Sequence, residues 1–145
     1  MLVLLDTNIL LRLAVPTHPM HMVARDAVIK LQANGDRLVL VPQNIYEYWV
    51  VATRPIPNNG LGFSTKHTES TVNALLETFS LLRDERGIFP LWQDLVRSMA
   101  ITGKLAHDCR IAAAMARHNV NRILTFNVSD FSRFVAISPI DPSNV

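Results

Sequence analysis

Short apolar runs alternate along the chain with longer segments whose apolar positions recur at helical spacing. Residues 2–5, 38–41 and 122–126 are apolar or nearly so throughout, which is typical of strands buried on both faces of a sheet. Residues 135–138 predict a short fourth strand. Strands that alternate with helical segments predict an α/β domain with a mainly parallel central sheet.

Helical segments are predicted between these strands. A helix over residues 20–32 ends at the stop signal Asn34-Gly35. A helix over residues 44–53 ends ahead of Pro55, because the residue before a proline avoids the helical region. The other predicted helical segments are residues 9–13, 68–82, 92–102 and 107–117, and residues 55–64 are predicted to form a surface loop.

Composition adds limits to this picture. The 145 residues, 49% of them hydrophobic and 18% charged, predict one globular domain over residues 1–145. A net charge of +2 permits a nucleic-acid partner without favouring one. The single cysteine, Cys109, excludes an internal disulfide and a cysteine-based zinc site. No apolar run approaches the roughly 18–20 residues that cross a bilayer, so we expect a cytoplasmic protein with no membrane contact.

Four acidic residues stand near the ends of predicted strands. Asp6 directly follows the first strand, and Asp130 lies in the loop after the third. Glu47 comes one helical turn after the second strand, while Asp108 opens the helix that leads into the third. Parallel sheets bind ligands beyond the carboxyl ends of their strands, so these four acids are expected at one edge of the sheet.

Each acid taken alone has an ordinary structural explanation. Asp6 can be the N-cap of the helix that follows it. Asn44-x-x-Glu47 matches a capping box, and Asp108 in a first helical turn gains from the helix dipole. Asp130 can cap a junction between loop and helix. Only the four acids together therefore indicate a functional site.

A cluster of carboxylates is strained, because like charges at short range raise one another's pKa. A hard divalent cation such as Mg²⁺ or Mn²⁺ relieves that strain and prefers oxygen ligands. The chemistry that such a site serves is hydrolysis of a phosphodiester bond. The chain has no phosphate-binding P-loop, no dinucleotide-binding glycine turn and no nucleophile elbow. Asn8 also stands where a haloacid dehalogenase pattern needs a second aspartate.

The segments around these acids resemble the four conserved motifs of PIN domains. The matching segments are Asp6-Thr7-Asn8-Ile9-Leu10-Leu11-Arg12, residues 42–55, residues 107–115 and residues 124–131. They follow one another in the family's order and span nearly the whole chain. The chain most resembles the VapC-like toxins of bacterial and archaeal toxin–antitoxin pairs, which are metal-dependent endoribonucleases.

The resemblance implies a three-layer α/β/α domain and a role for each acid. Asp6 and Asp108 would be the inner ligands of Mg²⁺ or Mn²⁺, Glu47 would help to position the attacking water, and Asp130 would be the fourth acid. The resemblance also implies an RNA substrate, a cognate antitoxin protein and a homodimer. It assigns supporting polar roles, for which local turn hydrogen bonding is the alternative, to Asn8, Thr125 and Asn127.

Other side chains near the motifs are candidates for RNA contact. Arginines form bidentate, charge-assisted bonds with phosphates, and those near the motifs are Arg12, Arg54, Arg110 and Arg133. Their alternative is a salt bridge or a solvated surface. Tyr46, Tyr48 and Trp49 can stack on bases, but they can equally be core or interface aromatics.

Three hypotheses follow from the sequence. The first is a metal-dependent endoribonuclease that is the toxin of a toxin–antitoxin pair. The second is a PIN-like nuclease that acts on DNA or structured RNA outside such a pair. The third is a non-catalytic platform that binds RNA or protein, which the complete set of acids disfavours.

Overall fold

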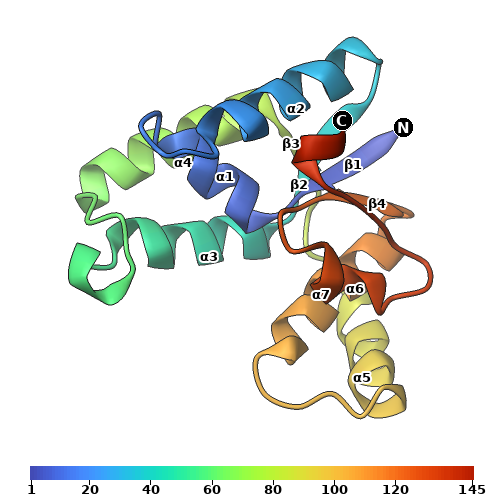
Figure 1. The fold of residues 1–145 in the computed structure, drawn as a ribbon. Helices are drawn as coiled ribbons and strands as arrows, with labels where there is room; N and C mark the ends of the chain where they lie inside the picture. Colours follow the sequence, from blue (N-terminus) through green and yellow to red (C-terminus); the bar gives the residue numbers. More distant parts are fainter.

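The computed structural model describes residues 1–145, in which a five-stranded sheet lies between two layers of helices (Figure 1). All neighbouring strands are parallel, in the order β3-β2-β1-β4-β5. The strands are β1 (Leu2–Leu5), β2 (Arg37–Leu40), β3 (Ser80–Leu81), β4 (Arg122–Leu124) and β5 (Ser138–Ile140). The predicted three-layer α/β/α class with a mainly parallel sheet is confirmed.

The helices divide between the two faces of the sheet. One layer holds α1 (Thr7–Ala14), α2 (His21–Ala33), α3 (Pro42–Thr53) and α4 (Thr65–Thr78). The other holds α5 (Ile88–Ser98), α6 (Leu105–Arg117) and α7 (Val128–Ser132). Two short 3₁₀ helices, η1 (Ile56–Asn58) and η2 (Pro142–Asn144), complete the structure. None of the helices combines the length and hydropathy that crossing a membrane requires.

Alternating strand residues build a separate core on each face of the sheet. Val3 and Leu5 of β1 point into the core beneath α1 to α4. Leu4, between them, points into the core beneath α5 to α7. Leu40 and Val39 of β2 divide between the two cores in the same way. Burial on both faces explains why these strands are continuous apolar runs in the sequence.

The predicted helix over residues 68–82 is wrong at its C-terminal end. Helix α4 ends at Thr78, and Ser80–Leu81 form β3, which pairs with β2 at the edge of the sheet. The buried ring of Phe79 anchors the junction in the core. Pairing with a distant strand, which local sequence does not encode, overrides the helical pattern here.

Two other predicted boundaries are displaced. The helix predicted over residues 92–102 is α5, Ile88–Ser98, which begins before Pro90 because a proline is tolerated in the first helical turn. It ends where Ala100 adopts a left-handed conformation, φ 50°. The strand predicted over residues 135–138 is β5, Ser138–Ile140, which lies at the edge of the sheet. Pro139 has no backbone N–H to donate, and an edge strand tolerates this because one of its sides has no neighbouring strand.

Candidate functional site

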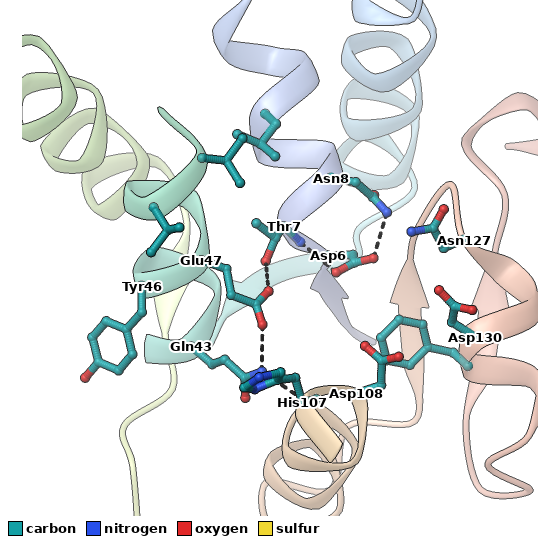
Figure 2. Close-up of a pocket in the computed structure, with 14 residues that line it drawn as sticks. Asp6, Thr7, Asn8, Gln43, Tyr46, Glu47, His107, Asp108, Asn127 and Asp130 are labelled. Atoms are coloured by element: carbon teal, nitrogen blue, oxygen red, sulfur yellow. Dashed lines mark hydrogen bonds between the residues drawn. The ribbon is translucent and has the colours of Figure 1, made fainter. Parts of the chain in front are cut away.

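All four predicted acids line one pocket at the carboxyl edge of the sheet. Asp6 follows β1, Glu47 lies on α3 after β2, and Asp130 lies on α7 after β4. Asp108 reaches the same pocket from the first turn of α6. The pocket has a volume of about 610 Å³, and Figure 2 shows carboxylates entering it from these four elements.

Asp6 is the most firmly held of the four acids. Its Oδ1 accepts a hydrogen bond from the backbone N–H of Thr7 at 2.7 Å, which makes Asp6 the N-cap of α1. Its Oδ2 accepts hydrogen bonds from Asn8 Nδ2 at 2.8 Å and from Thr125 Oγ1 at 2.6 Å. The capping explanation of Asp6 is therefore correct, and the same bonds fix this buried carboxylate at the floor of the pocket.

The predicted supporting residues differ in what they contact. Asn8 and Thr125 both donate to Asp6, and Asn8 Nδ2 also lies 3.3 Å from Thr125 Oγ1. Asn127 lines the pocket, and its backbone N–H donates to Thr125 Oγ1 at 2.9 Å. Its side chain makes no hydrogen bond that caps α7. Asn8 and Thr125 thus orient a carboxylate directly, whereas Asn127 acts on Thr125 through its backbone.

Glu47 does not cap its helix, so the predicted capping box of Asn44 with Glu47 is wrong. Helix α3 begins earlier, at Pro42, and Asn44 Oδ1 accepts instead from the backbone N–H of Val41 at 2.9 Å. Glu47 Oε2 accepts from Thr7 Oγ1 at 2.7 Å. Proline favours the first helical position, so the helix begins one turn ahead of the predicted cap. Glu47 therefore lies inside the helix, where its side chain is free to point into the pocket.

Two pocket residues, Thr7 and Gln43, were not predicted from the sequence. Gln43 Nε2 donates to Glu47 Oε1 at 2.8 Å and to the backbone oxygen of His107 at 2.9 Å. With Thr7, it therefore holds both oxygens of Glu47. The separation of four residues between Gln43 and Glu47 on one helix is the signal that could have revealed the pair.

Burial and mutual repulsion raise the pKa values of two of the acids, Asp6 and Asp108. Desolvation raises the pKa of Asp6 to about 6, against the hydrogen bonds from Thr125 and Thr7 and with help from the charges of Glu47 and Asp108. The pKa of Asp108 is also raised, first by burial and then by Asp130 and Glu47. The pocket therefore concentrates negative charge in a place that disfavours it, and a cation would relieve this cost.

The donor set suits a hard divalent cation. Its members are the four carboxylates that line the pocket. The structure places no group of three or more histidine, cysteine, aspartate or glutamate side chains close enough together to hold a metal ion. Mg²⁺ seldom needs such a group, since it usually keeps several waters and binds proteins through one or two carboxylates. The residues present therefore fit Mg²⁺ or Mn²⁺.

None of the four predicted RNA-contact arginines lines this pocket. Arg110 forms an ion pair with Asp84 at 2.8 Å, and Arg54 donates to the backbone oxygen of Asn59 at 3.1 Å. Arg133 Nε donates to the backbone oxygen of Asp130 at 3.0 Å, and its charge opposes the raised pKa of Asp108. Arg12 lies in the last turn of α1.

The three candidate aromatics also separate. Tyr48 is fully buried, and its hydroxyl lies 2.8 Å from Thr71 Oγ1, so it is a core residue. Tyr46 is 62% exposed and lines the acid pocket. Trp49 is partly exposed outside that pocket.

Residues 3–136 match the family model of the PIN domain. The chain belongs to the PIN-domain family. All four acids lie inside the matched region, so the pocket is part of the PIN domain itself. No curated protein matches this PIN domain in sequence.

Solved structures share the fold of this PIN domain. A toxin–antitoxin complex from Klebsiella pneumoniae matches with a TM-score of 0.67 and 21% identity, over 99% of each chain. VapBC-1 from nontypeable Haemophilus influenzae matches with a TM-score of 0.71 and 19% identity, also over 99% of each chain. VapC20 from Mycobacterium tuberculosis, a toxin that cleaves the sarcin-ricin loop, matches with a TM-score of 0.62 and 14% identity, over 91% of this chain and 95% of that one. At these identities the likeness establishes the fold.

Proposed function

We propose that this PIN domain is a Mg²⁺- or Mn²⁺-dependent endoribonuclease and the toxin of a toxin–antitoxin pair. The observation that carries the proposal is the convergence of Asp6, Glu47, Asp108 and Asp130 from four separate elements on one pocket of a PIN domain. PIN domains are nucleases, and the acid pocket is the part of this one equipped for hydrolysis of a phosphodiester.

In this proposal Asp6 and Asp108 bind the cation. When bound, the cation supplies charge stabilisation at the scissile phosphate and lowers the pKa of a coordinated water. Asp6 contributes a carboxylate whose direction is set by Thr7, Asn8 and Thr125. Such rigid support keeps a ligand in place without reorganisation during the reaction.

Glu47 and Asp130 complete the proposed site. Thr7 and Gln43 hold the carboxylate of Glu47 toward the pocket, where it can orient the attacking water and accept a proton from it. Asp130 faces the pocket beside Asp108, close enough for its charge to raise the pKa of Asp108. We assign Asp130 to the cation site, either directly or through a water.

The structural neighbours favour RNA as the substrate and an antitoxin as the partner. Two of them are toxin–antitoxin complexes, and a third is a toxin that cleaves the sarcin-ricin loop. We extend these properties to this chain, together with a cytoplasmic location and a homodimeric state. A nuclease of DNA or structured RNA outside a toxin–antitoxin pair is the alternative, and a non-catalytic platform would have no use for four converging acids.

The test is cleavage of pooled cellular RNA by the purified protein in Mg²⁺, in Mn²⁺ and in EDTA, with single-stranded and duplex DNA in parallel. We expect RNA cleavage that requires a metal, is absent in EDTA and leaves DNA intact. Sequencing of the cut ends then identifies the target. Cleavage of DNA in preference to RNA would support the alternative nuclease, and metal binding with no cleavage of any RNA would reject the enzyme.

A further inference from the structure

The acid pocket continues into two adjoining hollows along α5 and α6. The nearer hollow, about 310 Å³, shares Gln43, Tyr46 and His107 with the acid pocket. The farther hollow, about 400 Å³, shares Trp92 and Arg110 with the nearer one. The shared walls make one continuous surface that leads from the carboxylates to the outer side of α5.

Aromatic rings line this surface beyond the acids. Phe89 and Trp92, one turn apart on α5, are stacked with their centroids 5.9 Å apart and their planes at 29°. Phe89 is 60% exposed, so much of its ring is free of protein contacts. An exposed ring supported by a second aromatic is the kind of surface on which unpaired nucleobases stack.

A hydrogen bond fixes the ring of Trp92, on which Phe89 is stacked, relative to the helix that carries Asp108. Trp92 Nε1 donates to the backbone oxygen of Ala106 at 2.8 Å, and Gln43 Nε2 donates to the next backbone oxygen, that of His107, at 2.9 Å. The following residue is Asp108 itself, and Figure 2 shows Gln43 and His107 between Tyr46 and Asp108. The aromatic surface is therefore held at a fixed distance from the carboxylates, which a substrate subsite requires.

Arg110 gives the same surface a cationic group. It lines both hollows, and its Nη2 is bonded to Asp84 at 2.8 Å. Its side chain stays one-third exposed, at 33%, so the guanidinium can reach a phosphate or a base edge in the hollows. Glu85, the acid of the farther hollow, is neutralised by Arg117 at 2.7 Å.

We propose that Tyr46, Phe89, Trp92 and Arg110 form a base-stacking subsite for unpaired nucleotides of single-stranded RNA beside the scissile phosphate. This inference rests on the proposed nuclease function. Phe89 is the stacking platform, Trp92 backs it, and Arg110 contacts the neighbouring phosphate or base. The subsite selects a single strand, because a paired base keeps both of its faces inside the helix and cannot lie on Phe89.

The first test compares two substitutions of Phe89 on a single-stranded oligonucleotide that contains the cleaved bond. Phe89→Leu keeps an apolar side chain but removes the π-face, and we expect kcat/KM to fall by about tenfold, mainly through KM. Phe89→Tyr keeps the ring and should stay within about twofold of the wild type. Ile56→Ala, an exposed apolar residue outside both hollows, is the matched control and should change nothing.

The second test measures binding without turnover. The chain has two tryptophans, so Trp49→Phe leaves Trp92 as the only one. Titration with the same oligonucleotide in EDTA should quench Trp92 fluorescence, whereas its duplex form should not. Adding Phe89→Leu should weaken the apparent affinity by about tenfold.

The two proposals fail in different ways. Absence of RNA cleavage by the wild-type protein would reject the nuclease and the subsite with it. Wild-type cleavage that Phe89→Leu leaves unchanged would reject only the subsite. Unchanged cleavage combined with a lost dimer in sedimentation experiments would assign Phe89 to a protein interface instead.

Discussion

At the scale of single residues, the carboxylates that converge in the acid pocket lower the stability of the metal-free protein. Burial and the charges of Asp130 and Glu47 raise the pKa of Asp108, so its ionised form is disfavoured in the folded state. No protein donor compensates this carboxylate as Thr7, Asn8 and Thr125 compensate Asp6. Removal of the Asp108 carboxylate should therefore benefit folding without the loss of a hydrogen bond.

We predict that Asp108→Asn stabilises the protein in EDTA at pH 7 by up to about 1 kcal/mol, because it removes a repelled charge. Urea unfolding measures the change. The control is Glu77→Gln on α4, which should have no effect. Glu77 is exposed and does not line the acid pocket. A loss of stability in Asp108→Asn would mean that its carboxylate is favourably solvated.

The hydroxyl of Thr7 offers a second test at this scale. Thr7→Val keeps the shape of the side chain but removes the donor that holds Glu47 Oε2 at 2.7 Å. Loss of such a supporting bond typically costs about 10- to 100-fold in activity at a metal site. We expect cleavage to fall within this range, with KM nearly unchanged. Thr53→Val, whose hydroxyl bonds only within α3, is the control.

At the scale of helices and strands, the junction between α4 and β3 depends on one ring. Phe79 is buried between them, and Phe79→Ala should destabilise the protein by about 3 kcal/mol. Leu76→Ala, a partly exposed neighbour on α4, should cost much less. Thermal or urea unfolding measures both variants, and equal losses would contradict the assigned burial of Phe79.

Among the strands, those that local sequence predicted correctly are buried on both faces. β1 and β2 are continuous apolar runs and were found nearly to the residue. β3 and the bounds of β5 were not found, because a two-residue strand and an edge strand containing Pro139 owe their existence to pairing with distant partners.

In the candidate site too, the sequence predicts what depends on local order and misses what depends on contacts between distant elements. Asp6 and Asp130 could be placed because each follows a strand, and parallel strands end at the same edge. The hydrogen bond of Thr7 to Glu47 could not, because it depends on how α1 and α3 pack side by side. The bond of Gln43 to Glu47 lies within α3, and the spacing of four residues is a signal for it. Proximity of an arginine to a motif in the sequence says little about the direction of its side chain, and none of the four candidate arginines lines the acid pocket.

At the scale of the whole molecule, the pKa of Asp6 couples folding to pH. Its folded value of about 6 exceeds its ordinary value of 3.8, so the folded state binds a proton more tightly than the unfolded state. This contribution to stability is fully present below pH 3.8 and is lost as the pH rises through 6. Its upper limit is about 3 kcal/mol.

We therefore predict that the metal-free protein becomes more stable as the pH falls from 7.5 to about 5.5, and that saturating Mg²⁺ reduces this dependence by stabilising the protein most at the higher pH. Urea unfolding in EDTA and in Mg²⁺ across this range measures both effects. A metal-free protein that loses stability over the same interval would contradict the raised pKa of Asp6.

We also propose that residues 1–145 unfold as one domain, because both helical layers pack on the same sheet. Fluorescence and circular dichroism should then report coincident unfolding transitions. Two separated transitions would show that the layers fold independently.

Metal-dependent hydrolysis of RNA by the four converging acids can be tested at each acid separately. The most direct measurement is the single-turnover cleavage rate of the identified RNA in Mg²⁺ for the variants Asp6→Asn, Glu47→Gln, Asp108→Asn and Asp130→Asn, with Glu77→Gln as the control. We predict that each pocket variant loses about 100-fold or more, while it remains folded and the control stays at the wild-type rate. Full activity of folded Asp6→Asn would contradict the assignment of hydrolysis to this pocket.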